Sequence, residues 1–187
     1  MDPPFVRRAP ETLLTRRLLL RRPCAGDAEA IFHAYACDEE VTRYLSWRTH
    51  RQLSDTRAYL EWSDYEWMRW PAGPFLAFTR QPEGNLIGGT GLAFRSAAEA
   101  STGYVLAREA WNHGYATECL QAMIELARRL GVRRLESVCH LEHRASAHVM
   151  EKCGMRREGV LIEHTEFPNL APGVRLAVMR YLVEFSG

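Results

Sequence analysis

A short β-like run, a glycine-containing turn and a long helical pattern follow one another between residues 102 and 131, and this succession constrains the fold most strongly. The run is Thr102–Leu106, the turn begins the stretch Trp-Asn-His-Gly-Tyr-Ala-Thr-Glu at 111–118, and the helical pattern ends at Gly131. A turn between a strand and a helix start leaves backbone N–H groups unpaired at the positive end of the helix dipole. Because such groups bind phosphate and pyrophosphate, we expect a phosphate-bearing cofactor here.

The composition is that of one globular domain. With 187 residues, of which 47% are hydrophobic, the chain can bury one sizeable core. Residues 1–12 contain three prolines and are predicted to form a disordered N-terminal arm, and residues 13–187 a single domain.

Charge and cysteine content exclude several classes of function. A net charge of +1 does not indicate the basic surface that nucleic-acid binding requires. The five cysteines lack the spacing of a metal site or a disulfide framework, so no metal is expected. The N-terminus has no signal-peptide pattern and no run approaches the ~20 apolar residues that span a bilayer, so a cytoplasmic protein without membrane contact is predicted.

The order of the predicted elements indicates an α/β (α+β) fold with a mixed sheet. Antiparallel pairs surround one β-α-β crossover, and no early G-x-G-x-x-G turn supports a dinucleotide-binding Rossmann domain. Periodicity predicts strands at 15–22, 75–79, 86–94, 102–106, 135–139, 155–162 and 176–183, and helices at 25–36, 54–70, 117–130 and 146–153.

Four blocks of this sequence carry a family resemblance. Thr15–Arg21 is similar to an opening T-x-R-L-x-L-R strand, and Trp111–Glu118 to a W-G-x-G-Y-A-T-E loop. His143–Ser146 stands where N-x-x-S is usual, and Val149–Met155 is similar to V-L/M-E-K-x-G-F. In this order and spacing, the blocks resemble the GNAT superfamily of acyl-CoA-dependent acetyltransferases, in its RimJ/RimL-like branch of ribosomal-protein N-terminal acetyltransferases.

The resemblance implies both a fold and an activity. The fold would be a mostly antiparallel sheet of about seven strands with about four helices, splayed between the fourth and fifth strands. The activity would be an acetyl-CoA-dependent N-acetyltransferase that acts on a primary amine, either a protein N-terminus or a small molecule, by direct attack on the thioester. The protein would be a monomer or a homodimer.

Coenzyme A suits the loop at 111–118 on physical grounds. Backbone N–H groups at the helix start would hold its pyrophosphate, and Gly114 permits a close approach. The pantetheine amides need an exposed strand edge, which the resemblance places just upstream. The predicted cofactor-binding residues are Val105, Leu106, Ala107, His113, Gly114, Tyr115, Ala116, Thr117, His143 and Ser146.

Two residues are the predicted catalytic groups. The backbone N–H near Leu106 would stabilise the oxyanion, and the Ser146 hydroxyl would protonate the departing thiolate. From residue type alone, Ser146 is also an ordinary helix N-cap, which remains an alternative. The base that deprotonates the amine stays open among Glu163, His164, Glu166 and water.

Two departures from the family pattern motivate a second hypothesis. Asn112 replaces the usual first glycine of the loop, although asparagine tolerates left-handed φ, and His143 replaces an asparagine that typically contacts the cofactor arm. A non-catalytic acyl-CoA-binding or regulatory module is therefore the alternative function. The aromatic residues of 62–75 are interpreted either as core or as an acceptor-groove wall.

Overall fold

The computed structural model describes residues 7–81 and 83–185. Within those residues the chain forms an eight-stranded sheet with the order β1-β2-β3-β4-β5-β6-β8-β7, in which only β5 and β6 pair in parallel. The strands are β1 (Thr12–Leu14), β2 (Leu18–Arg21), β3 (Pro74–Arg80), β4 (Glu83–Phe94), β5 (Glu99–Leu106), β6 (Arg134–His140), β7 (Arg156–Glu166) and β8 (Arg175–Glu184).

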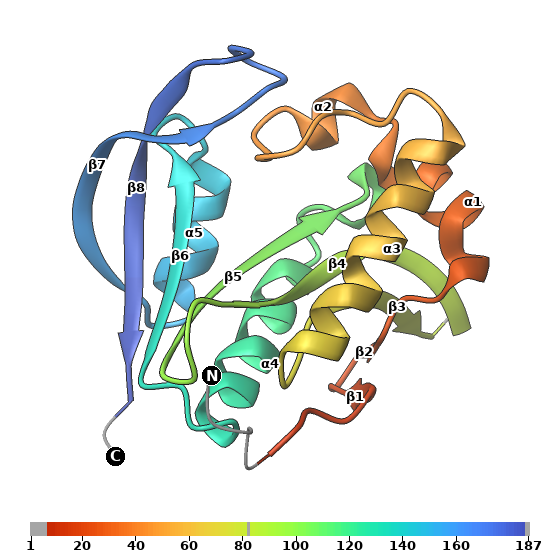
Figure 1. Ribbon diagram of the computed structural model, residues 1–187, viewed down its shortest axis with the longest axis horizontal. Helices are drawn as coiled ribbons and strands as arrows, with labels where there is room; N and C mark the ends of the chain where they lie inside the picture. Colours follow the sequence, from red (N-terminus) through yellow and green to blue (C-terminus); the bar gives the residue numbers. More distant parts are fainter. Residues whose placement is uncertain (1–6, 82, 186–187) are drawn as a thin grey trace.

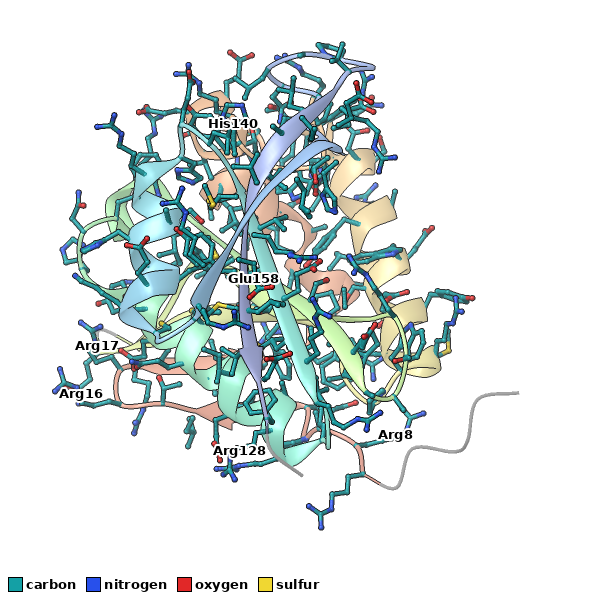
Figure 2. All side chains as sticks on the ribbon, turned by 90° about the vertical axis from the view of Figure 1, so that its left-hand side faces the viewer. Arg8, Arg16, Arg17, Arg128, His140 and Glu158 are labelled. Atoms are coloured by element: carbon teal, nitrogen blue, oxygen red, sulfur yellow. The ribbon has the colours of Figure 1, made fainter. Side chains whose placement is uncertain are left out.

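Helices cover both faces of this sheet. Figure 2 shows α4 and α5 on one side of the strands and α3 on the other, so the molecule has three layers. The helices are α1 (Ala28–Ile31), α2 (Glu39–Thr42), α3 (Leu53–Arg69), α4 (Tyr115–Arg129) and α5 (Arg144–Lys152), with a π-helical turn at Phe32–Ala36 and 3-10 turns at Ala25–Asp27 and Arg108–Ala110.

Strand alternation divides the core between the two faces. Leu76 of β3 packs with Ile31 and Leu60 on the α1 and α3 side, whereas its neighbour Phe75 belongs to the cluster that includes Met123 of α4. Neighbouring side chains of a strand point to opposite faces, so most of the apolar residues divide between the two helical layers, although Trp67 near the end of α3 packs against Phe75. The burial of both faces fixes the register of the central strands.

The predicted strand at 15–22 is wrong at its beginning. Residues 15–17 form the turn of a hairpin in which β1 pairs with β2, and β1 is the strand that exceeds the predicted seven. The Thr15 hydroxyl accepts a hydrogen bond from Leu18 N–H at 2.9 Å and donates to Glu118 of α4 at 2.6 Å. Hydrogen bonds between Thr15 and Leu18 close this turn, and the contact with Glu118, about a hundred positions away, attaches it to α4.

The N-terminal arm is described only in part, because residues 1–6 lie outside the described residues. Ala9 donates a backbone hydrogen bond to Pro71 O at 2.7 Å, and the Arg8 guanidinium binds the carbonyl oxygens of Trp67 and Trp70 at 3.0 and 3.2 Å. Residues 8 and 9 thus contact the C-terminal end of α3. In the described part of the chain, no helix combines the length and apolar content needed to cross a membrane.

The sheet opens between β5 and β6, at the place predicted from the sequence. The two strands pair only from Glu99 to Ser101, opposite Arg134 to Glu136, and diverge beyond them. Gly88 of β4 contributes to this geometry, because a Cβ atom there would lie 2.0 Å from Val105 O. With φ at 153°, a conformation that side chains disfavour, Gly88 lets β4 approach β5 closely where β5 leaves β6.

Candidate functional site

The loop between β5 and α4 takes the conformation that its residues favour. Gly114 is the N-cap of α4 with φ 77° and ψ 9°, and Asn112 also has a left-handed φ, of 62°. Asparagine is enriched in the left-handed region, so Asn112 preserves the turn although it replaces the usual glycine. The first helical residues, Tyr115, Ala116 and Thr117, present N–H groups that have no intrahelical acceptor. Such N–H groups, at the positive end of the α4 dipole, have the chemistry that suits an anion.

Glu118 holds this loop against the β1–β2 turn. Its carboxylate accepts hydrogen bonds from the Thr15 hydroxyl, Arg17 N–H at 2.7 Å and Arg17 Nε at 2.7 Å. Burial alone would raise the pKa of Glu118, but these hydrogen bonds outweigh it and lower the pKa below the ordinary value. Arg17 also donates to His113 O at 2.8 Å and lies over the Tyr115 ring at 4.5 Å. Glu118 therefore fixes the loop.

Of the three residues predicted on the strand edge, Leu106 directs its main chain into the opening. Ala107 N–H bonds Ile87 O at 2.9 Å, so Ala107 and, by alternation, Val105 pair with β4. The same alternation turns Leu106 N–H away from β4. The Leu106 carbonyl already accepts the Trp111 indole N–H at 2.8 Å, which leaves the Leu106 N–H as the group offered to a ligand.

Ser146 is not a helix cap, so that alternative is wrong. The N-cap of α5 is His143, and Ser146 is the third helical residue. Its Oγ lies 3.0 Å from the Tyr104 hydroxyl, which also donates to Ser146 O at 3.1 Å. Burial raises the pKa of Tyr104, and so the phenol keeps its proton at neutral pH. The sequence prediction missed Tyr104, although the alternation from Leu106 places it on the same strand edge.

His143 contacts an aromatic residue from a distant part of the chain. The Tyr44 ring stacks on His143 with 4.8 Å between centroids and on His140, at the end of β6, with 5.2 Å. Burial, and then the proximity of His140, lower the pKa of His143 below its usual value. The His143 imidazole is therefore neutral at pH 7 and lies near the end of β6.

A cavity of about 630 Å³ lies beside the loop, between the β1–β2 turn and α4. Its lining includes Gly114 and Thr117 from the start of α4, Arg16 and Arg17 from the turn, and Lys152 from the end of α5. Figure 2 shows Arg16 and Arg17 together at this edge, far from His140. The cavity thus continues from the start of α4 along a partly basic surface, away from Ser146.

Two of the cysteines, Cys139 and Cys153, are unsuited to act as nucleophiles. Burial raises the pKa of Cys139 and of Cys153 to about 11, so neither thiol is a nucleophile at neutral pH. Among residues 7–81 and 83–185, no cluster of His, Cys, Asp or Glu is placed to hold a metal ion.

The remaining candidates are either buried core residues or lie on α3 and near the end of β7. Trp67, Trp70 and Phe75 are core residues, whereas Trp62 and Tyr65 are exposed on α3. The base candidates lie near the end of β7: Glu166 accepts Gly173 N–H at 2.9 Å, His164 Nδ1 lies 2.8 Å from Thr165 Oγ1, and Glu163 is exposed with a φ of 48°.

Comparison with known proteins identifies the family. The sequence model of the acetyltransferase (GNAT) domain family matches residues 17–156, which is most of the chain. The chain belongs to the GNAT acetyltransferase family. It is 29% identical over 162 residues to the uncharacterized N-acetyltransferase YoaA of Bacillus subtilis (strain 168), covering 81% of this chain and 86% of YoaA.

Solved structures have the same fold. A GNAT-family acetyltransferase from Bacillus anthracis superposes with a TM-score of 0.78 at 24% identity, covering 92% of this chain and 98% of that one. RimL, a ribosomal L7/L12 α-N-protein acetyltransferase solved with coenzyme A, superposes with a TM-score of 0.79 at 20% identity, covering 92% and 97%. The predicted family and GNAT fold, with a RimL structure among the neighbours, are confirmed; the eighth strand, β1, is an addition at one edge.

Proposed function

We propose that this GNAT acetyltransferase transfers an acetyl group from acetyl-CoA to a primary amine by direct attack on the thioester. The observation that carries the proposal is the opening between β5 and β6, which leads to the N–H groups at the start of α4. A ligand with amides in its middle and a pyrophosphate farther along satisfies both features at once. Coenzyme A has this chemistry, and it is bound in the RimL structure.

The residues of the loop and the cavity fit the nucleotide end of that ligand. N–H groups from Tyr115 to Thr117 would hold the pyrophosphate, and the open edge of β5 would face the pantetheine arm, which leaves Leu106 N–H for the thioester oxygen. Beyond Gly114, the cations Arg16 and Lys152 line the cavity and would attract a further phosphate of the nucleotide. The neutral His143 ring would contact the arm from the β6 side.

Two groups of this chain would assist the acetyl transfer. Acetyl-CoA, when bound, supplies a thioester whose carbonyl carbon accepts the amine nitrogen and whose sulfur leaves. Leu106 N–H would donate a hydrogen bond to the oxygen on which negative charge develops. Ser146 Oγ would give its proton to the departing sulfur and recover one from solvent.

Tyr104 would set the direction of the Ser146 proton. Its phenol lies 3.0 Å from Ser146 Oγ and stays protonated because burial raises its pKa. The phenol has a single proton, which goes either to Ser146 O or to Ser146 Oγ; in the second arrangement the serine proton points away from Tyr104 and toward the opening. The base that takes the proton from the amine remains a proposal among Glu163, His164, Glu166 and a water molecule. The acceptor is a small-molecule amine or a protein N-terminus, the second because RimL is an α-N-protein acetyltransferase.

The test measures thiol release and product together. The enzyme is mixed with acetyl-CoA and each of three amines, trialanine, spermidine and kanamycin, which represent a peptide N-terminus, a polyamine and an aminoglycoside. We expect free thiol and acetylated amine in equal amounts with at least one of them. Tight acetyl-CoA binding without thiol release above background for all three would instead support the non-catalytic acyl-CoA-binding module.

A further inference from the structure

A segment far from the family motifs crosses the open ends of β5 and β6. Residues 38–50, here called the bridge segment, contain α2 and the loop that follows it. Figure 1 shows α2 at the top of the molecule, above the end of β5 and facing the long turn between β7 and β8. Arg108, just after β5, binds Asp38 at 2.7 Å and Glu40 at 3.1 Å. One end of the bridge segment is therefore attached to the β5 side of the opening.

The middle of the bridge segment reaches the β6 side. Tyr44 stacks on His140 and His143, the residues that end β6 and cap α5. Phe167, from the turn between β7 and β8, packs edge-on against His140 with 5.2 Å between centroids. Two loops that are distant in the sequence thus meet on the His140 ring, and Tyr44 also covers His143, shortly before Ser146 in the chain.

One side chain joins these two loops. Asn169, from the β7–β8 turn, donates through Nδ2 to Thr42 O at 2.7 Å and to Trp47 O at 2.9 Å. Its Oδ1 accepts Thr49 N–H at 2.9 Å and the Thr49 hydroxyl at 3.1 Å. The buried Thr42 and Thr49 hydroxyls bond each other at 2.6 Å. Because two carbonyls face Nδ2 and an N–H faces Oδ1, only one amide orientation satisfies this clamp.

We infer that Asn169 is a positioning residue for the acceptor amine. It holds the bridge segment and the β7–β8 turn together, so that Tyr44 and Phe167 form a fixed wall at the open ends of β5 and β6. The inference rests on the proposed function, because an acceptor site exists only if the chain transfers an acetyl group. Asn169 makes none of these hydrogen bonds with the loop at 111–114 or with α4, and it reaches the cofactor side only indirectly, through Tyr44 stacked on His143. Its larger effect therefore falls on the amine.

The variant Asn169→Asp tests this role with little change in shape. The Nδ2 donor becomes a carboxylate oxygen facing two carbonyls, whereas the bonds from Thr49 can persist. Asn169→Leu removes all four hydrogen bonds. The matched control is Arg8→Met, since Arg8 also binds main-chain carbonyls about sixty residues away, at the end of α3 and remote from His140 (Figure 2).

The measurements separate the amine from acetyl-CoA. With the best wild-type acceptor among trialanine, spermidine and kanamycin, we expect the acceptor KM to rise about tenfold in Asn169→Asp and more in Asn169→Leu. The Kd of acetyl-CoA should stay within about twofold. Hydrogen exchange of the Thr49 amide should accelerate in Asn169→Leu, and Arg8→Met should leave the acceptor KM unchanged.

Two results would overturn the inference while leaving the proposed function intact. The first is a wild-type acceptor KM in Asn169→Leu despite faster exchange at Thr49. The second is an equal rise of the acetyl-CoA Kd and the acceptor KM, which would mean general loosening of the fold. A wild-type enzyme that releases no thiol with any of the three amines would remove the proposed function and this inference together.

Discussion

The two sides of the proposed site are built by different means. The cofactor side, residues 104–118 and 143–146, presents main-chain N–H groups that one strand, one turn and one helix start position locally. The acceptor side, the bridge segment and residues 163–174, is assembled by side-chain contacts such as those of Asn169 and Tyr44. Main-chain groups suit acetyl-CoA, because the structure of this ligand does not change. Side-chain contacts between loops allow the residues of the acceptor side to differ while the cofactor side stays the same.

Backbone strain occurs on both sides. Among the described residues other than glycine, Asn112 and Glu163 have positive φ, at 62° and 48°. Asn112 tolerates this conformation and shapes the turn for the cofactor. Glu163 has a higher conformational cost, of roughly 1–3 kcal/mol, beside the β7–β8 turn, where the amine is proposed to enter. Glu163 lies within the register shift between Leu161 and Thr165 of β7, which accounts for this conformation.

The largest expected effect lies where the two sides meet. Ser146→Ala should lower kcat about 100-fold and leave the acetyl-CoA Kd within about twofold, because the hydroxyl acts on the leaving sulfur. Steady-state kinetics with calorimetric titration of acetyl-CoA measures both quantities. Ser101→Ala, at the start of β5, is the control. An unchanged kcat in Ser146→Ala would remove Ser146 from the mechanism.

Tyr104→Phe tests the partner of Ser146. Loss of the phenol hydroxyl should reduce kcat about tenfold without changing either the acetyl-CoA Kd or the acceptor KM, since the ring still fills its place. Because Tyr104 acts only through Ser146, the double variant Tyr104→Phe with Ser146→Ala should be no slower than Ser146→Ala alone. Additive losses in this double-mutant cycle would contradict the pairing.

Gly114→Val probes the cofactor side alone. A side chain at φ 77° is strained by about 1–2 kcal/mol, and a Cβ there would lie 3.5 Å from Arg17 Nη2. The acetyl-CoA Kd should rise about tenfold, and the acceptor KM at saturating acetyl-CoA should not change. A rise in the acceptor KM instead would show that the two sides are not separable.

Glu118→Gln is expected to affect stability more than turnover. Replacing a carboxylate that accepts three hydrogen bonds should cost about 1–3 kcal/mol at pH 7. Because the pKa of Glu118 is lowered in the folded state, its contribution is complete above the ordinary value of 4.5 and is lost as the pH falls through the folded pKa. The difference in Tm between wild type and variant should therefore shrink from pH 6 toward pH 3. A constant difference would exclude the charge as its source.

The secondary structure of the proposed cofactor side was predictable because its signals are local. The strand, turn and helix of 102–131 follow from spacing and glycine placement, and the opening of the sheet follows from the family resemblance. The start of α5 was misplaced by two residues, since His143 caps the helix without a side-chain hydrogen bond. Tyr104 was missed although alternation along β5 indicates it.

The acceptor side had no comparable signal. The helix α2 has four residues and no apolar period, so its position depends on Asp38 as N-cap and on Arg108. Asn169 bonds residues about 120 positions away, and a lone asparagine beside a proline predicts only a turn. Likewise, β1 is held through Thr15 by Glu118 of α4. Such contacts become visible only in the folded chain.

The most direct test of direct transfer is a single-turnover experiment with acetyl-CoA labelled in the acetyl group. Enzyme and labelled acetyl-CoA are mixed first without amine, and the active amine from the panel is added afterwards. We predict no labelled protein and no thiol release in the first stage, followed by equal amounts of free thiol and labelled amine in the second. Thiol release with a labelled protein before the amine is added would contradict direct transfer at the opening between β5 and β6.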